Sequence, residues 1–224
     1  MKEKLYKYLQ TFITEKRANL IEQISQNRTR YITVALENVY QPHNASAVLR
    51  TCDCFGIQDV HIVENSNKYQ VNPDVTLGSD KWLNIARYNE NENNTIQALN
   101  KIREKGYRII ATVPDKDAVF PENVDLIKGK AAFFFGTELS GLSREAISNA
   151  DEFVKIPMYG FTESFNISVS AAIILYEITN KLRKSAIKWE LEDEELLDIK
   201  IQWIKKSLKK GDIIEKEFLK RSRI

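Results

Sequence analysis

Three segments of the chain combine short polar side chains, glycines and an arginine in arrangements that could bind a ligand and support chemistry. They run from 44 to 51 (NASAVLRT), from 135 to 142 (FGTELSGL) and from 156 to 170 (IPMYGFTESFNISVS). Each lies where an apolar run typical of a strand gives way to a stretch typical of a helix. Open α/β sheets bind their ligands at the carboxyl ends of strands, so we expect the three segments to meet in one site.

The first segment offers an amide and a guanidinium. Asn44 starts a predicted helix, and Arg50 lies six residues further, nearly two turns along, so its long side chain could reach back toward the same end. A guanidinium placed there can form two parallel hydrogen bonds to a phosphate. The plainer interpretations are that Asn44 only caps the helix and that Arg50 only makes a surface ion pair.

The second segment is a loop bracketed by Gly136 and Gly141, two residues that let the backbone pass close to a ligand. The second glycine is not followed by the Lys and Ser/Thr of a P-loop, so we do not expect phosphate cradling of that kind. A generic nucleotide-binding α/β protein would need such a loop. The sequence therefore argues against that class.

The third segment is a loop of ten residues between an apolar strand and an apolar helix. Pro157 and Gly160 shape this loop, and its backbone amides could hold the edge of a purine. Ser164 and Asn166 supply short hydrogen-bonding side chains at the start of the helix, where either could also serve simply as a cap.

The residues present in the chain argue against hydrolase activity and against a metal site. There is no Gly-x-Ser-x-Gly motif, and the only histidines are His43 and His61, which argues against Ser-His-Asp triads and His-based metal sites. We interpret His61, inside a predicted strand, as structural. His43 remains a candidate because it adjoins Asn44. No metal is expected.

Apolar strands that alternate with helices must position the three segments. The predicted strands cover 31–39, 59–64, 107–113, 131–135 and 153–156, and the predicted helices cover 45–55, 95–105, 143–150 and 167–183. The Asn-rich stretch 65–94 is predicted to be irregular. Strands that are apolar throughout, rather than alternating, predict an α/β domain with a mostly parallel sheet and flanking helices.

This domain is expected to span 31–184, with helical extensions at 1–30 and 185–224. Both extensions carry basic clusters: seven Lys or Arg against three Glu in 1–30, and nine Lys or Arg against three acidic residues in 200–224. Because the net charge is only +2, this distribution is more informative than the total. Basic clusters at both ends are consistent with terminal helices that bind a polyanion. Solvated helix faces would give the same pattern.

The remaining composition favours a cytoplasmic protein. No apolar run approaches the ~20 residues that span a bilayer, and the N-terminus lacks the apolar core and cleavage site of a signal peptide. The only cysteines, Cys52 and Cys54, lie two apart on a predicted helix and point in different directions, so they suit neither a disulfide nor a metal pair.

Together the three segments resemble the three motifs of the SPOUT methyltransferases, in their TrmH-like branch. The matching positions are Asn44, Ala47 and Arg50-Thr51 in the first motif, Gly136, Glu138 and Gly141 in the second, and Ile156-Pro157-Met158, Gly160 and Ser164-Phe165-Asn166-Ile167-Ser168-Val169-Ser170 in the third. Order and spacing agree over roughly residues 20–185, and three motifs in register are far more specific than one. Phe165 replaces the usual Leu, and the C-terminal tail is longer and richer in lysine.

Finer features are similar to the tRNA guanosine-18 2′-O-methyltransferases of this branch. These features are PHN at 42–44, RTCD at 50–53, GSDKW at 78–82, and helical extensions at both ends. The resemblance implies a deep trefoil knot over about 131–183, a fold that sequence physics would not suggest. It also implies a homodimer whose site borrows from both chains.

The resemblance implies that S-adenosyl-L-methionine is the cofactor and that it sits in the knot. The residues whose backbone would hold it are Thr112, Gly136, Ile156, Met158 and Phe165. The reaction would be in-line methyl transfer to a ribose 2′-oxygen of tRNA, with the basic terminal helices contacting phosphates.

Arg50 is the residue that we expect to be essential, with Asn44, Glu138, Ser164 and Asn166 positioning it, the ribose and the cofactor loop. The family description makes this arginine a general base. A guanidinium keeps its proton up to pKa values above ~12, so anchoring a phosphate and stabilising the developing alkoxide is the better physical role.

Two alternatives stay open. The same chemistry could act on another tRNA nucleotide or on ribosomal RNA, although only about 30 residues precede the first strand, too few for a separate RNA-binding domain. A protein of another class, a non-catalytic RNA-binding protein with the same fold, is disfavoured by the intact Arg50, Glu138, Ser164 and Asn166.

Overall fold

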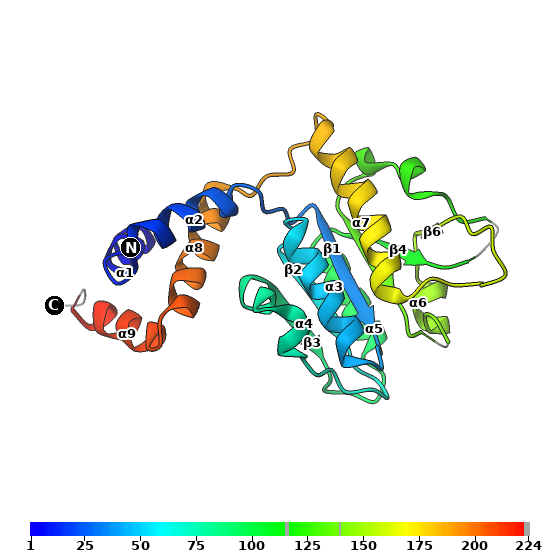
Figure 1. The fold of residues 1–224 in the computed structure, drawn as a ribbon, viewed down its shortest axis with the longest axis horizontal. Coiled ribbons are helices and arrows are strands. Elements are labelled where there is room, and N and C mark those ends of the chain that lie inside the picture. The colour runs from blue at the N-terminus through cyan, green and yellow to red at the C-terminus, as the bar shows by residue number, and fades with distance from the viewer. Residues whose placement is uncertain (115–116, 139, 222–224) are drawn as a thin grey trace. The chain divides into compact units, whose positions relative to one another are not determined.

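A computed structural model describes residues 1–114, 117–138 and 140–221 of the chain (Figure 1). The chain divides into two compact units. One unit is Thr29–Trp189, and the other combines Met1–Arg28 with Glu190–Ile224. Within the described ranges, none of the helices has the length and apolar character needed to span a bilayer.

The larger unit is built on a six-stranded sheet in which all described pairings are parallel. Its strands in spatial order are β3 (Asn84–Tyr88), β2 (Asp59–Val63), β1 (Ile32–Glu37), β5 (Ala131–Phe135), β4 (Arg108–Thr112) and β6 (Glu152–Val154). Every residue of β1 and β5 is buried, because helices cover both faces of the sheet centre. The predicted α/β class with a parallel sheet is confirmed.

The two faces of the sheet carry different helices. Val34 and Leu36 of β1 pack in one core with α3 (Pro42–Cys54) and α7 (Ile167–Lys184), which lie side by side (Figure 1). Ala35, between them in β1, packs in a second core with α5 (Thr95–Glu104) and α6 (Arg144–Ser148). The period of two along the strand explains this division.

The structure differs from the predictions most in 65–94, which contains an edge strand, β3, and two short helices, α4 (Pro73–Thr76) and η1 (Ser79–Trp82). Since β3 is only half-buried and contains polar residues, it lacks the apolar run by which the other strands were predicted. Two further short helices, η2 (Pro121–Asn123) and η3 (Leu126–Lys128), lie between β4 and β5.

The terminal unit consists of α1 (Lys2–Gln10), α2 (Glu15–Ser25), α8 (Asp193–Ser207) and α9 (Gly211–Arg221). Leu9, Trp203 and Ile204 are fully buried in it. The two extensions that the sequence places at opposite ends therefore fold together as one unit.

Several lysines of this unit form ion pairs within it rather than remaining available to a ligand. Lys2 contacts Glu194 at 2.9 Å and Asp198 at 2.8 Å, and so joins α1 to α8. The exposed lysines outside these ion pairs include Lys4, Lys7, Lys16, Lys209, Lys210, Lys216 and Lys220. The structure thus narrows the set of basic residues that could meet a polyanion.

Candidate functional site

A cavity of about 380 Å³ lies at the carboxyl ends of β4, β5 and β6. Its walls come from the segments that follow these strands and from the start of α7. The lining residues are Thr112, Val113, Pro114, Phe135, Gly136, Thr137, Glu138, Ser140, Gly141, Val154, Lys155, Ile156, Met158, Glu163, Ser164, Phe165, Ile167, Ser170 and Ile174. All five residues predicted to hold a cofactor, Thr112, Gly136, Ile156, Met158 and Phe165, are among them.

The loop after β5 is closed on itself. The backbone amides of Thr137 and Gly141 each donate to the other residue's carbonyl, at 3.0 and 3.1 Å. A Cβ on Gly136 would lie 2.1 Å from the Gly141 carbonyl carbon, and Gly141 itself has φ +68°. Both positions require glycine, so the spacing of the second segment reflects a tight turn at the cavity wall. We refer to 136–142 as the glycine loop, with Leu139 outside the described residues.

Hydrogen bonds through Asn44 connect all three sequence segments. The Asn44 amide nitrogen donates to Glu138 Oε1 at 2.5 Å, and Asn166 donates to Asn44 Oδ1 at 3.1 Å. Asn44 is 1% exposed, and its amide also donates to Gln41 Oε1 at 3.2 Å. The expectation that the three segments would meet is therefore met by direct contact.

The helix-cap interpretation of Asn44 is wrong. Helix α3 starts at Pro42, with Gln41 as its N-cap, because proline is well suited to the first helical position. Asn44 consequently lies inside the first turn and turns its side chain into the protein. Asn166, in contrast, does cap α7: its Oδ1 accepts from the Ser168 amide at 2.8 Å while its amide contacts Asn44.

Arg50 and His43 lie on α3 with exposed side chains. Within the described ranges, no hydrogen bond joins Arg50 to Asn44 or Glu138. Six residues correspond to about 240° of rotation beyond one full turn, so Arg50 projects from a different side of α3 than Asn44 does. Its exposed guanidinium has no hydrogen-bond partner among the described residues and is accessible to a ligand, and its role stays a prediction.

His61 is part of the sheet core. It is buried in β2, its Nδ1 lies 2.8 Å from the Tyr88 hydroxyl, and burial lowers its pKa to about 4. Lys105 lowers this pKa further through its charge. A neutral, buried histidine away from the cavity fits the structural interpretation.

The comparisons with known proteins agree with this geometry. The family model described as "SpoU rRNA Methylase family" matches residues 31–176, which include all three segments. The chain belongs to this family.

Relatives of this methylase cover nearly all of its length. The tRNA (guanosine(18)-2′-O)-methyltransferase of Borreliella burgdorferi is 42% identical over 207 residues, 92% of this chain and 93% of the relative. The enzyme of the same name from Thermus thermophilus is 35% identical, over 86% and 98% of the two chains. The A. aeolicus TrmH/SpoU tRNA modifying enzyme superposes with a TM-score of 0.77 at 32% identity, covering 88% and 98%.

Sequence reasoning assigned no role to two charged residues that line the methylase cavity. Glu163 and Lys155 bring opposite charges to it, and Ser170, which the third motif includes, adds a hydroxyl from α7. The sequence signal of Glu163 and Lys155 was weak, since charged residues in a loop are usually solvated. Only the loop geometry places them at the cavity.

Proposed function

We propose that this methylase transfers the methyl group of S-adenosyl-L-methionine to the ribose 2′-oxygen of guanosine 18 in the D-loop of tRNA. The observation that carries the proposal is the Asn44 network, which joins the three family segments at a ligand-sized cavity. The choice of guanosine 18 follows the names of relatives that match the chain almost end to end. The protein would work in the cytoplasm, where it would meet its tRNA.

The cavity suits this cofactor. Its volume lies in the range of roughly 300–1,000 Å³ that is usual for small-molecule sites. Phe135 and Ile174 give it apolar walls. Glu138 and Glu163 bring carboxylates that favour the cationic groups of the cofactor, and Lys155 brings an ammonium that favours its carboxylate. When bound, S-adenosyl-L-methionine supplies a methyl group on a positively charged sulfonium, which needs no further activation.

The chain's own residues would bind and orient the two reactants. Thr112, Gly136, Ile156, Met158 and Phe165 would hold the cofactor, largely through backbone groups, because glycine and apolar side chains dominate this set. Fixing the cofactor in one geometry reduces the entropy that the methyl transfer must otherwise lose at its barrier.

The polar residues would act on the ribose side of the reaction. Asn44, Glu138 and Asn166 keep the three segments in register, and Ser164, at the cavity, would orient the ribose. Arg50 would anchor a substrate phosphate and stabilise charge on the 2′-oxygen as its proton leaves to solvent. It keeps its own proton throughout.

The trefoil knot is part of the proposal. The segments that would form it, the glycine loop and the loop 155–166, line the same cavity, and α7 returns to pack against α3. This arrangement is compatible with one loop passing through the other, as the resemblance implies.

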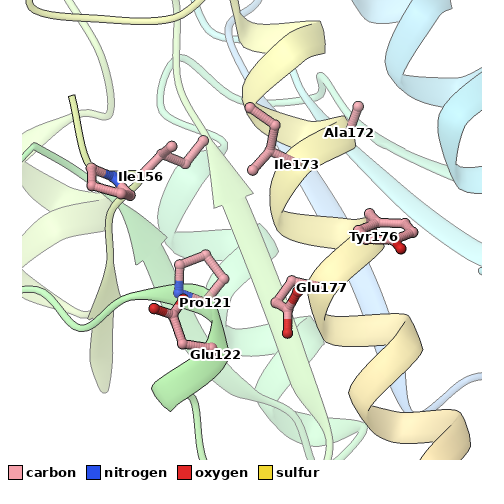
Figure 2. A pocket seen from close by; sticks show the side chains of 8 residues that line it. Pro121, Glu122, Ile156, Ala172, Ile173, Tyr176 and Glu177 are labelled. Carbon is pink, nitrogen blue, oxygen red and sulfur yellow. The ribbon is translucent and has the colours of Figure 1, made fainter. Parts of the chain in front are cut away.

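A homodimer is also proposed, and α7 is the surface that would form it. Three of its apolar side chains are exposed: Val169 by 44%, Ile173 by 38% and Tyr176 by 58%. Beside them lies a hollow of about 380 Å³, in which Ile156 and Pro121 lie opposite Ile173 and Glu177 (Figure 2). A second copy of the chain is the occupant that would cover this face.

The position of this hollow ties dimerisation to the active site. Ile156 lines both the hollow and the cofactor cavity. A partner subunit seated on α7 would therefore lie next to the bound cofactor. It could add its own residues to the site, as the resemblance implies.

The experiment that tests the proposed function maps the product. Purified protein is incubated with total tRNA and methyl-labelled S-adenosyl-L-methionine, and the labelled nucleoside is identified and located. Label as 2′-O-methylguanosine at position 18 is expected. Label on another tRNA nucleotide, or only on ribosomal RNA, would retain the chemistry and refute the target. No label on either RNA, with retained RNA binding, would favour the non-catalytic alternative.

A further inference from the structure

Glu37 is a buried carboxylate that the sequence motifs do not include. It is the last residue of β1, at the centre of the sheet, and is 2% exposed. Burying a charge is costly unless hydrogen bonds compensate for it. The hydrogen-bond partners of Glu37 therefore indicate the role of this buried carboxylate.

Three donors converge on this carboxylate from two different elements. Ser143 contributes its backbone amide to Oε2 at 2.8 Å and its hydroxyl to Oε1 at 2.7 Å. Thr95, the first residue of α5, donates its hydroxyl to Oε1 at 2.5 Å. An ionised carboxylate can only accept hydrogen bonds, and all three of these groups can donate one, so donors and acceptor are complementary.

Ser143 is the residue at which the glycine loop ends and α6 begins. Its hydroxyl also accepts from the Ala146 amide at 3.1 Å and so caps α6. The middle of the glycine loop is held in place by Glu138, which accepts a hydrogen bond from Asn44. Glu37 therefore fixes the end of a loop whose middle is fixed by Asn44.

We propose that Glu37 is a positioning residue that holds the glycine loop in the shape required to bind the cofactor. The inference rests on the proposed function and adds to it a residue outside the three motifs. Without this anchor, Ser143 loses two charge-assisted hydrogen bonds, and among the described residues the glycine loop keeps its contact with Asn44 at Glu138 and its internal Thr137–Gly141 pairing. Loss of this anchor should therefore weaken cofactor binding more than it slows the methyl-transfer step.

Two substitutions that each remove one hydroxyl distinguish a positioning role of Glu37 from a general effect on stability. Ser143→Ala and Thr95→Val each remove one hydroxyl that donates to Glu37 Oε1. Only Ser143 directly follows the glycine loop in the chain. Ser143→Thr keeps the hydroxyl and serves as the rescue. Glu37→Gln keeps the volume but places an amide where a carboxylate oxygen accepted.

The first measurement is hydrogen exchange in the ligand-free dimer or monomer, whichever the protein forms. Glu37→Gln and Ser143→Ala should speed exchange of the Thr137 and Gly141 amides by about tenfold, the factor that corresponds to one lost hydrogen bond. Thr95→Val and Ser143→Thr should leave these amides within about twofold of wild type. Equal acceleration in Ser143→Ala and Thr95→Val would overturn the proposal.

The second measurement is calorimetric binding of S-adenosyl-L-methionine, together with KM and kcat. Glu37→Gln and Ser143→Ala should raise Kd and KM for the cofactor by about tenfold, with kcat changed less than KM. Unchanged Kd in both variants would refute the positioning role. A wild-type protein that does not bind the cofactor would instead refute the proposed function, while the exchange data would still report on Glu37.

Discussion

At the scale of single residues, the proposed roles of the side chains follow from where the chain places them. Arg50 is the clearest case, because it is exposed and makes no hydrogen bond to the Asn44 network among the described residues. Arg50→Ala should lower kcat by about a hundredfold or more, the scale of losing one group that stabilises developing charge. Arg50→Lys should recover only part of this, since an ammonium lacks the planar fork.

Steady-state methylation of tRNA measures this effect, with Arg103→Ala as the matched control. Arg103 makes a surface ion pair with Asp151 at 3.0 Å, on the opposite face of the sheet from α3. Its loss should leave turnover near wild type. Near-wild-type turnover in Arg50→Ala would exclude Arg50 from the chemistry.

His61 gives a prediction about pH. Its pKa is lowered from 6.5 to about 4 in the folded protein, first by burial and then by the charge of Lys105. Above pH 6.5 both folded and unfolded states carry a neutral ring. Between pH 6.5 and about 4 only the unfolded state binds the proton, so this contribution to stability falls by about 1.4 kcal/mol for each pH unit.

Urea unfolding at about pH 7 and about pH 5, on either side of the unfolded-state pKa, measures that loss. His61→Gln, which keeps a polar partner for Tyr88, should reduce the drop in unfolding free energy between these two pH values. An identical drop in wild type and variant would show that His61 does not titrate in this way.

The residue scale also shows where sequence reasoning reached its limit. Asn44 and Asn166 were predicted from their types and their places after strands, and the structure brings them together. Glu37 lay within a run of strand residues, where nothing local distinguishes it from a strand end facing solvent. Its hydrogen-bond partners, Ser143 and Thr95, are far from it in the sequence and lie beside it only in the folded protein.

At the scale of elements, α7 has two different faces. One packs against α3 in the core, and the other carries exposed Ile173 and Tyr176. Ile173→Glu should shift the protein from dimer to monomer, because burying an unpaired carboxylate in an apolar interface costs several kcal/mol. Analytical ultracentrifugation reads this directly.

The control for this variant is Ile96→Glu on α5. Ile96 is 40% exposed, close to the 38% of Ile173, but it belongs to the helix on the other face of the sheet. It should leave the dimer intact. A monomeric wild type, or an Ile173→Glu protein that remains dimeric, would argue against α7 as the interface.

Elements were predicted well where the sequence carries a continuous apolar run. The strand 131–135 and the helix 167–183 coincide with β5 and α7 to within one residue, because continuous apolar runs and a cap define them. The half-buried edge strand β3 was missed, and α3 begins earlier than expected because Pro42 initiates it. The proposed knot would depend on the order in which loops pass each other, which no local pattern records.

At the scale of the whole molecule, the exposed lysines of α1, α2 and α9 predict how tRNA binds. Contacts to phosphates release counterions, so affinity falls steeply with salt. The Kd for tRNA should rise by about a hundredfold or more between ~50 and ~200 mM salt, while the Kd for the cofactor should change little. Fluorescence anisotropy and calorimetry measure the two, and a tRNA Kd that is insensitive to salt would contradict the electrostatic account.

Methyl transfer to the 2′-oxygen of guanosine 18 is tested most directly with one tRNA in two forms that differ by a single oxygen. One transcript carries guanosine at position 18, and the other carries 2′-deoxyguanosine there. We expect about one methyl group to be transferred per molecule of the first transcript and none to the second, with similar binding of both. Equal methylation of the two transcripts would show that the 2′-oxygen of guanosine 18 is not the acceptor.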